Sequence, residues 1–174
     1  YILDLVSKTN VNEIHLIDGD TFCQHNAFRS PGAASKEIFP KSMSKVSYFK
    51  GKYQNMHKNL IEYDMFIKEE NVSTLKDMDF VFICIDSGIA RKIITDYLVS
   101  EEIPFIDAGM GLQNINDTIN GQIRITVFDK TNYDRIPVYL DFDEDGDDVY
   151  NTNIQIAECN ALNAIEMGEM VREN

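Results

Sequence analysis

The chain has 174 residues and a formal net charge of −13, a length that predicts one domain with enough residues to bury a core. The negative charge argues against a nucleic-acid partner, which would require a basic surface. No apolar run approaches the roughly 18 residues of a membrane span, and no signal peptide is visible, so we expect a cytoplasmic protein without membrane contact. The three cysteines form no C-x-x-C pair, which argues against a structural zinc site.

Helices and short strands are predicted to alternate along the first 108 residues. Helices are expected at 1–8, about 42–57 and 88–102, with a possible helical turn at 72–76. Strands are expected at 13–18, 60–67, 79–85 and 104–108. Such alternation is typical of parallel strands joined by right-handed crossovers. The stretch 79–85, DFVFICI, is the most apolar strand and is expected in the middle of the sheet.

The second part of the chain has a different pattern. Residues 112–115 and 122–128 are predicted to pair as antiparallel strands around a turn at Asn120-Gly121. An acidic loop at 129–148 and a final helix at 153–172 follow. The predicted fold class is therefore α/β, a three-layer, doubly wound, Rossmann-like and mainly parallel sheet with antiparallel strands at one edge.

A doubly wound nucleotide-binding fold normally starts with a central strand and a glycine-rich turn before its first helix. Residue 1 already lies in a segment predicted to be that helix. We therefore expect residues 1–174 to be one domain that lacks its first strand and glycine loop, and to be a fragment of a longer protein.

Candidate nucleotide-binding residues follow the first predicted strand. Asp18 and Asp20 come directly after the apolar segment EIHLI, where a nucleotide-binding fold places an acid that hydrogen-bonds ribose. Asn26 and Arg29 follow in the next loop, and the planar guanidinium of Arg29 suits phosphate oxygens.

Two further candidates lie on other elements. Lys45 opens a predicted helix and would place an ammonium group near the same strand ends. Asp86 ends the strand DFVFICI, so its carboxylate is also expected at the carboxyl edge of the sheet.

The ordered series of these segments resembles the ThiF/MoeB/HesA family, which is similar to ubiquitin-activating enzymes. The segment IHLIDGDTFCQHNAFR resembles the family pattern of an apolar strand, D-x-D and N-x-x-R. Lys45-Val46 opens a helix as the family lysine does. The segments VFICIDSGIARKII, IPFIDAGMG and NIQIAECNALNA resemble the later strands and the last helix of the family.

The resemblance implies ATP-dependent adenylation of the C-terminal glycine of a ubiquitin-like or sulfur-carrier protein, by a homodimer. Asp18 and Asp20 would bind the nucleotide, with Asp20 on the ribose. The phosphates would be held by Asn26, Arg29 and Lys45. Asp86 would bind Mg²⁺, and Arg29, Lys45 and Asp86 would be the catalytic residues.

Other interpretations remain open. The chain could be a non-catalytic scaffold or pseudoenzyme subunit of the same superfamily, or a dinucleotide-dependent oxidoreductase, although Arg29 and Lys45 would then have no role. The stretch Asp141–Thr152 mimics a calcium loop but has Thr152 where a bidentate Glu belongs. Asp86 could also cap the helix that follows it.

Overall fold

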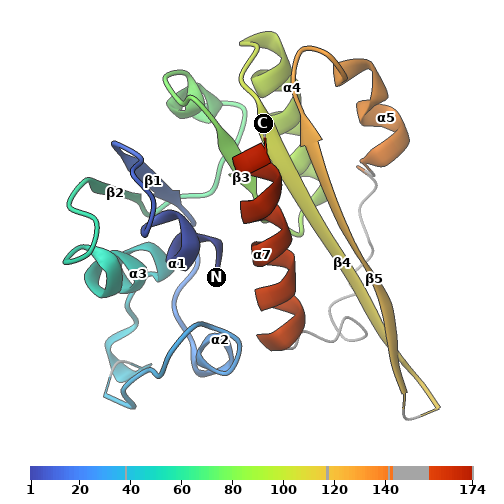
Figure 1. Cartoon of the computed structure of the whole chain (residues 1–174). Coiled ribbons are helices and arrows are strands. Elements are labelled where there is room, and N and C mark those ends of the chain that lie inside the picture. Colours follow the sequence, from blue (N-terminus) through green and yellow to red (C-terminus); the bar gives the residue numbers. More distant parts are fainter. Residues whose placement is uncertain (38, 117, 141, 143–156, 174) are drawn as a thin grey trace. The chain divides into compact units, whose positions relative to one another are not determined.

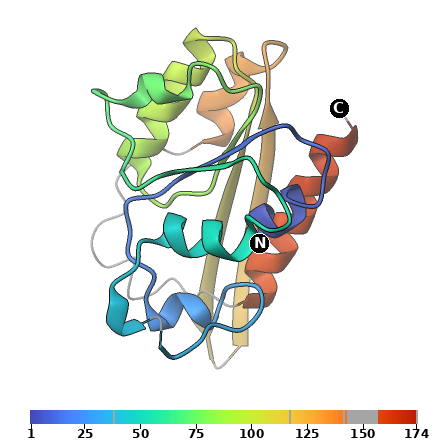
Figure 2. The same cartoon turned by 90° about the vertical axis from the view of Figure 1, so that its left-hand side faces the viewer.

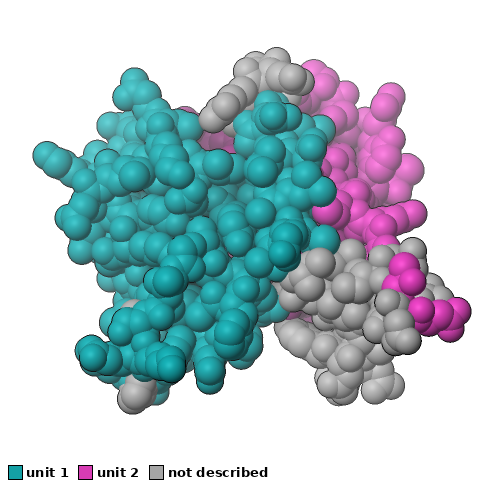
Figure 3. Space-filling view, turned by 60° about the horizontal axis from the view of Figure 1, so that its bottom comes forward, with its two compact units in different colours: residues 1–66, 156–174 teal, residues 67–155 magenta. Residues whose placement is uncertain are grey.

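The structure is a computed structural model that describes residues 1–37, 39–116, 118–140, 142 and 157–173. The chain divides into two compact units, shown in different colours in Figure 3. The first unit comprises Tyr1–Phe66 together with Ile156–Asn174, and the second comprises Ile67–Gln155.

The first unit is built on a parallel pair of strands. β1 (Ile14–Ile17) pairs with β2 (Leu60–Tyr63), so that Ile17 lies opposite Tyr63 at their carboxyl ends. The crossover between the strands contains the short helices α2 (Gln24–Ala27) and η1 (Phe39–Lys41) and the longer helix α3 (Lys45–Tyr53). This arrangement confirms the expected strand–helix–strand order.

Aromatic residues from the crossover form the core of the first unit. Phe22 is 1% exposed, and its ring stacks on that of Tyr48 with centroids 3.7 Å apart. Val46 and Leu60 are also buried. The core therefore fixes α3 close to the loop that follows β1.

Helices from the two ends of the chain also pack together in the first unit. α1 (Ile2–Val6) lies beside α7 (Ala157–Glu173) (Figures 1 and 2). A Cβ added at Gly168 would lie 3.6 Å from Leu5 Cδ1, an ordinary van der Waals distance, so the contact between these helices does not depend on a glycine at this position. None of the described helices is both long and apolar enough to cross a lipid bilayer.

The second unit contains a three-stranded sheet in the order β3-β4-β5 (Figure 1). β3 (Val81–Ile83) is parallel to β4 (Phe105–Ile115), and β4 is antiparallel to β5 (Thr118–Phe128). η2 (Val72–Leu75) precedes β3, and α4 (Gly88–Ser100) connects β3 to β4. Two short helices, η3 (Tyr133–Arg135) and α5 (Ile136–Tyr139), follow the sheet.

The core of this unit joins the sheet to its neighbouring helices. Phe105 and Phe128 are both 0% exposed, and their ring centroids are 5.1 Å apart. Leu98 of α4 is also fully buried. Tyr133 donates a hydrogen bond to the Ile103 carbonyl at 3.0 Å, which ties η3 to the start of β4.

Two sequence-based predictions about the sheet are wrong. The hairpin turn lies at Asn116 rather than at Asn120-Gly121, because Ile115 pairs with Thr118 and Gly121 lies inside β5. Asn116 has a φ of 51°, a left-handed conformation that Asn tolerates better than most residues. Among the described strands β3 pairs only with β4, so it occupies an edge of its sheet and not the middle.

Candidate functional site

A tight turn follows β1 in the first unit and brings two carboxylates together. Asp18 Oδ1 accepts a hydrogen bond from the backbone N–H of Asp20 at 2.8 Å, which is the geometry of an Asx turn. The carbonyl of Asp20 in turn accepts from the backbone N–H of Lys45 at 2.8 Å. The turn is therefore attached directly to the start of α3.

The helix start beside this turn is well defined. Ser44 is the N-cap of α3, and its Oγ accepts from the Ser47 N–H at 3.3 Å. The preceding loop is held in place because Phe22 N–H donates to the Met43 carbonyl at 2.8 Å. The first residue of α3, Lys45, is thereby fixed next to the carboxyl end of β1.

Lys45 forms ion pairs with both acids of the turn. Its Nζ lies 3.5 Å from Asp18 Oδ2 and also contacts Asp20 Oδ2. The Lys45 side chain is 22% exposed and that of Asp20 52%, so this cluster lies at the surface and is accessible. The structure brings together Asp18, Asp20 and Lys45, although Lys45 is 25 residues from Asp20 in the sequence.

An aromatic ring lies against the same turn, and the sequence analysis missed it. Phe66 comes shortly after β2, and its ring occupies the space in which a side chain at position 19 would lie. A Cβ added to Gly19 would be 2.7 Å from Phe66 Cδ2, so any side chain at position 19 would require the ring to move. Phe66 is nevertheless 57% exposed. The only sequence signal was an apolar residue near the end of the strand expected at 60–67, and the structure ends that strand at Tyr63.

The structure gives Asn26 a local role in its own loop. Its side chain is 6% exposed, and its Oδ1 accepts a hydrogen bond from the Cys23 N–H at 2.8 Å. Arg29, which follows α2, has a half-buried side chain, and its N–H donates to the Asn26 carbonyl at 3.2 Å. A phosphate contact by either side chain remains a prediction.

Asp86 belongs to the second unit and lies in the loop between β3 and α4, with an exposed side chain. It is not the cap of α4. Ser87 occupies the N-cap position, and its Oγ accepts from the Ala90 N–H at 3.3 Å. The interpretation of Asp86 as a helix cap is therefore wrong.

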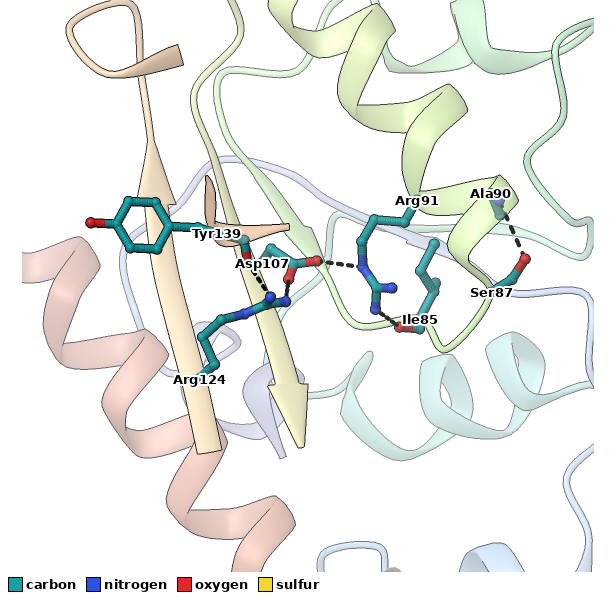
Figure 4. A network of polar contacts seen from close by, with 7 residues as sticks. All are labelled: Ile85, Ser87, Ala90, Arg91, Asp107, Arg124 and Tyr139. Atoms are coloured by element: carbon teal, nitrogen blue, oxygen red, sulfur yellow. Dashed lines mark hydrogen bonds and ion pairs between the residues drawn. The ribbon is translucent and has the colours of Figure 1, made fainter. Parts of the chain in front are cut away.

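A buried polar network lies next to this loop (Figure 4). Asp107, in β4, is 0% exposed. Its Oδ1 accepts from Arg91 Nε at 2.9 Å and its Oδ2 from Arg124 Nη2 at 2.6 Å. Arg91 Nη2 also donates to the carbonyl of Ile85 at 2.5 Å. The second arginine, Arg124, donates to the carbonyl of Tyr139.

The described residues contain no group of three or more His, Cys, Asp and Glu side chains that could hold a metal ion by themselves. Mg²⁺ does not require such a group, because it is commonly bound by one or two carboxylates together with substrate phosphates and water. The exposed carboxylate of Asp86 fits that mode of binding. The calcium-loop interpretation of 141–152 falls almost entirely outside the described residues.

Comparison with known proteins identifies the class. Residues 1–162 match the model of the ThiF family, so the chain belongs to this family. The chain is similar in structure to E. coli MccB with MccA-N7isoASN, with a TM-score of 0.73 and 16% identity over 98% of this chain and 51% of that one.

A second similar structure is that of E. coli tRNA N6-threonylcarbamoyladenosine dehydratase, TcdA. It has a TM-score of 0.56 and 21% identity over 63% of this chain and 47% of that one. The chain therefore spans about half the length of these proteins. A search of curated protein sequences finds no match. The structural similarities confirm the predicted Rossmann-like α/β fold.

Proposed function

We propose that this protein uses ATP to adenylate the C-terminal carboxylate of a protein or peptide, most specifically of a ubiquitin-like or sulfur-carrier protein. The observation that carries the proposal is the cluster of Asp18, Asp20 and Lys45 at the carboxyl end of β1, in a chain of the ThiF family. Similar structures include MccB with ATP and TcdA with ATP or AMP, which supports ATP as the nucleotide.

In the proposed reaction a carboxylate oxygen of the carrier attacks the α-phosphorus of ATP. A new P–O bond forms as the bond to the β-phosphate oxygen breaks, and acyl-adenylate and pyrophosphate result. The nucleophile is already ionised and needs no general base. The protein contributes mainly positioning and stabilisation of negative charge.

The residues around the first-unit turn have distinct roles in this proposal. The exposed carboxylate of Asp20 accepts hydrogen bonds from the ribose hydroxyls. Lys45 leaves its carboxylate partners and binds the phosphates, helped by Arg29 and Asn26. Phe66, which is 57% exposed and lies against Gly19, supplies an aromatic ring for stacking on the base.

Asp86 is the proposed ligand of Mg²⁺, with ATP phosphates and water completing the coordination. When bound, the metal would offset charge on the departing pyrophosphate. We further propose that the protein is a homodimer. Leu162 and Ile165, 49% and 46% exposed on α7, support an additional apolar contact there, and sedimentation of the full-length protein tests it.

Exchange of labelled pyrophosphate into ATP tests the proposal. The full-length protein should catalyse exchange only when a carrier with a C-terminal glycine is present, and deletion of that glycine from the carrier is the matched control. Hydride transfer from a nicotinamide would instead identify an oxidoreductase. No exchange with any carrier, combined with normal carrier binding, would favour the scaffold interpretation.

A further inference from the structure

We propose that Arg91 and Asp107 are positioning residues that hold Asp86 in place for metal binding, with Arg124 anchoring Asp107 from its other side. This inference rests on the proposed function, because the position of Asp86 matters for activity only if it binds the metal. Neither arginine is assigned a contact with nucleotide or metal.

The first step of the argument is the contact between Arg91 and the loop. Arg91 Nη2 donates to the carbonyl of Ile85 at 2.5 Å, and Ile85 immediately precedes Asp86 in the chain. The residue after Asp86, Ser87, is the N-cap position at which α4 begins. The Ser87 carbonyl also accepts from the Arg91 N–H at 2.9 Å. This backbone bond is the i→i−4 bond at the start of α4 and forms with any side chain at position 91. The Arg91 guanidinium therefore holds the backbone on the Ile85 side of Asp86, while the Asp86 side chain stays exposed.

The second step is what holds Arg91 itself. Its side chain is 11% exposed, and its Nε lies 2.9 Å from Asp107 Oδ1. A guanidinium is planar, so fixing Nε to one acceptor and Nη2 to another sets the orientation of the whole group. The contact with Asp107 thus determines where Arg91 places its bond to the Ile85 carbonyl.

The third step is the charge on Asp107. The side chain has no exposure, yet each of its two oxygens accepts from a different arginine. A buried carboxylate is costly unless it is paired and hydrogen-bonded, and here two guanidinium groups pair with the Asp107 carboxylate and hold it in one orientation. Arg124 extends the network because it also donates to the Tyr139 carbonyl at the end of α5. Figure 4 shows the continuous path from Tyr139 to Ile85.

A network that served only stability would not affect metal binding selectively. The proposal differs, because loosening the carbonyl at residue 85 should alter the direction of the Asp86 carboxylate. Mutation of residues that orient a metal ligand without touching the metal typically lowers metal affinity by about 10- to 100-fold. The signature of positioning is therefore a change in metal requirement without an equal change in nucleotide affinity.

The test uses Arg91→Lys in the full-length protein. This change keeps the positive charge but removes the planar guanidinium that contacts both Asp107 and the Ile85 carbonyl. We expect the Mg²⁺ concentration for half-maximal pyrophosphate exchange to rise about tenfold or more, while the Kd for ATP measured without metal stays unchanged. Amide hydrogen exchange at residues 86–88 should become faster. Lys92→Met is the matched control: Lys92 is the next residue of α4, pairs with Asp96 at 2.9 Å and should leave all three measurements as in the wild type.

A second variant keeps the inference testable if Arg91→Lys does not fold. Arg124→Gln removes the half-exposed partner and leaves Arg91 in contact with both Asp107 and Ile85. We expect a smaller rise in Mg²⁺ requirement than for Arg91→Lys. An unchanged Mg²⁺ requirement in Arg91→Lys, or equal losses of metal and nucleotide affinity, would overturn the inference. If the wild type shows no pyrophosphate exchange with any carrier, the proposed function fails, and the amide exchange of residues 86–88 still tests the positioning.

Discussion

Lys45 Nζ lies 3.5 Å from Asp18 Oδ2, across the turn that follows β1. The lysine also pairs with Asp20, so two carboxylates face one ammonium group. This arrangement holds the lysine side chain at the place where phosphates are proposed to bind. The cluster contains two carboxylates and one ammonium group. We therefore expect only a strongly anionic ligand to displace the carboxylates from Lys45.

Lys45→Met is expected to weaken ATP binding while leaving the fold nearly unchanged. A hydrogen bond to a charged group contributes about 1.5–3 kcal/mol, so the Kd for ATP should rise about tenfold or more. An exposed ion pair contributes less than about 1 kcal/mol to stability, so the melting temperature should hardly move. Calorimetric titration and thermal unfolding of the full-length protein measure the two effects.

Lys50→Met provides the control for that experiment. Lys50 lies on the same helix and pairs with Glu62 at 3.6 Å, away from the Asp18–Asp20 turn. Its ATP affinity should equal that of the wild type. A similar loss of ATP affinity in both variants would mean that the affinity depends only on the overall charge of α3.

Phe66→Leu is expected to reduce affinity for the base of the nucleotide. Base–aromatic stacking contributes roughly 1–3 kcal/mol, so binding of a fluorescent purine triphosphate should weaken by about tenfold. The quenching of the nucleotide's fluorescence on binding should also decrease. Val11→Ala, at an exposed apolar position (42%) before the amino end of β1, is the control. Equal quenching by the wild type and Phe66→Leu would exclude a stacking role for the ring.

Much of the arrangement follows from sequence patterns. Carboxyl ends of parallel strands meet at one edge of a sheet, so the proximity of Asp20 and Lys45 could be predicted from the strand–helix order. The contact between Phe66 and Gly19 could not, because it depends on the side-chain packing of residues from two different strand ends. The spacing of apolar residues within a helix or strand does not indicate which residues of different elements will come into contact.

The hairpin and the buried network show a different limit. Asn120-Gly121 is the stronger local turn signal, yet pairing along two 11-residue strands places the turn at Asn116. The stabilisation summed over all the residue pairs of β4 and β5 is greater than the preference of the Asn120-Gly121 dipeptide for a turn. Asp107 could not be identified as a buried ion from the sequence, because its two arginine partners come from α4 and β5 and only the fold brings them together.

The metal requirement is predicted to be for Mg²⁺ and not for zinc. The described residues offer no cluster of His, Cys, Asp and Glu for a tightly held ion, whereas Mg²⁺ can bind through one carboxylate and the ATP phosphates. Removing free Mg²⁺ with a chelator should abolish pyrophosphate exchange, and adding Mg²⁺ should restore it. Elemental analysis that found one zinc per chain would contradict this prediction.

Asp86→Ala and Ser87→Ala are predicted to have opposite effects on activity and stability. Asp86 is exposed and does not cap α4, so its loss should change the free energy of unfolding by less than about 1 kcal/mol. Pyrophosphate exchange should nevertheless be abolished, because removing a metal ligand removes several kcal/mol of charge stabilisation in the transition state.

Ser87→Ala is the matched control, one residue along the same loop. Its Oγ caps the helix through the Ala90 N–H, and loss of a cap costs about 1 kcal/mol of stability. Exchange should continue at nearly the wild-type rate, because Ser87 has no role in the proposed chemistry. Thermal unfolding and pyrophosphate exchange are measured on both full-length variants. Near-normal exchange by Asp86→Ala would remove Asp86 from the active site, whatever its effect on the melting temperature.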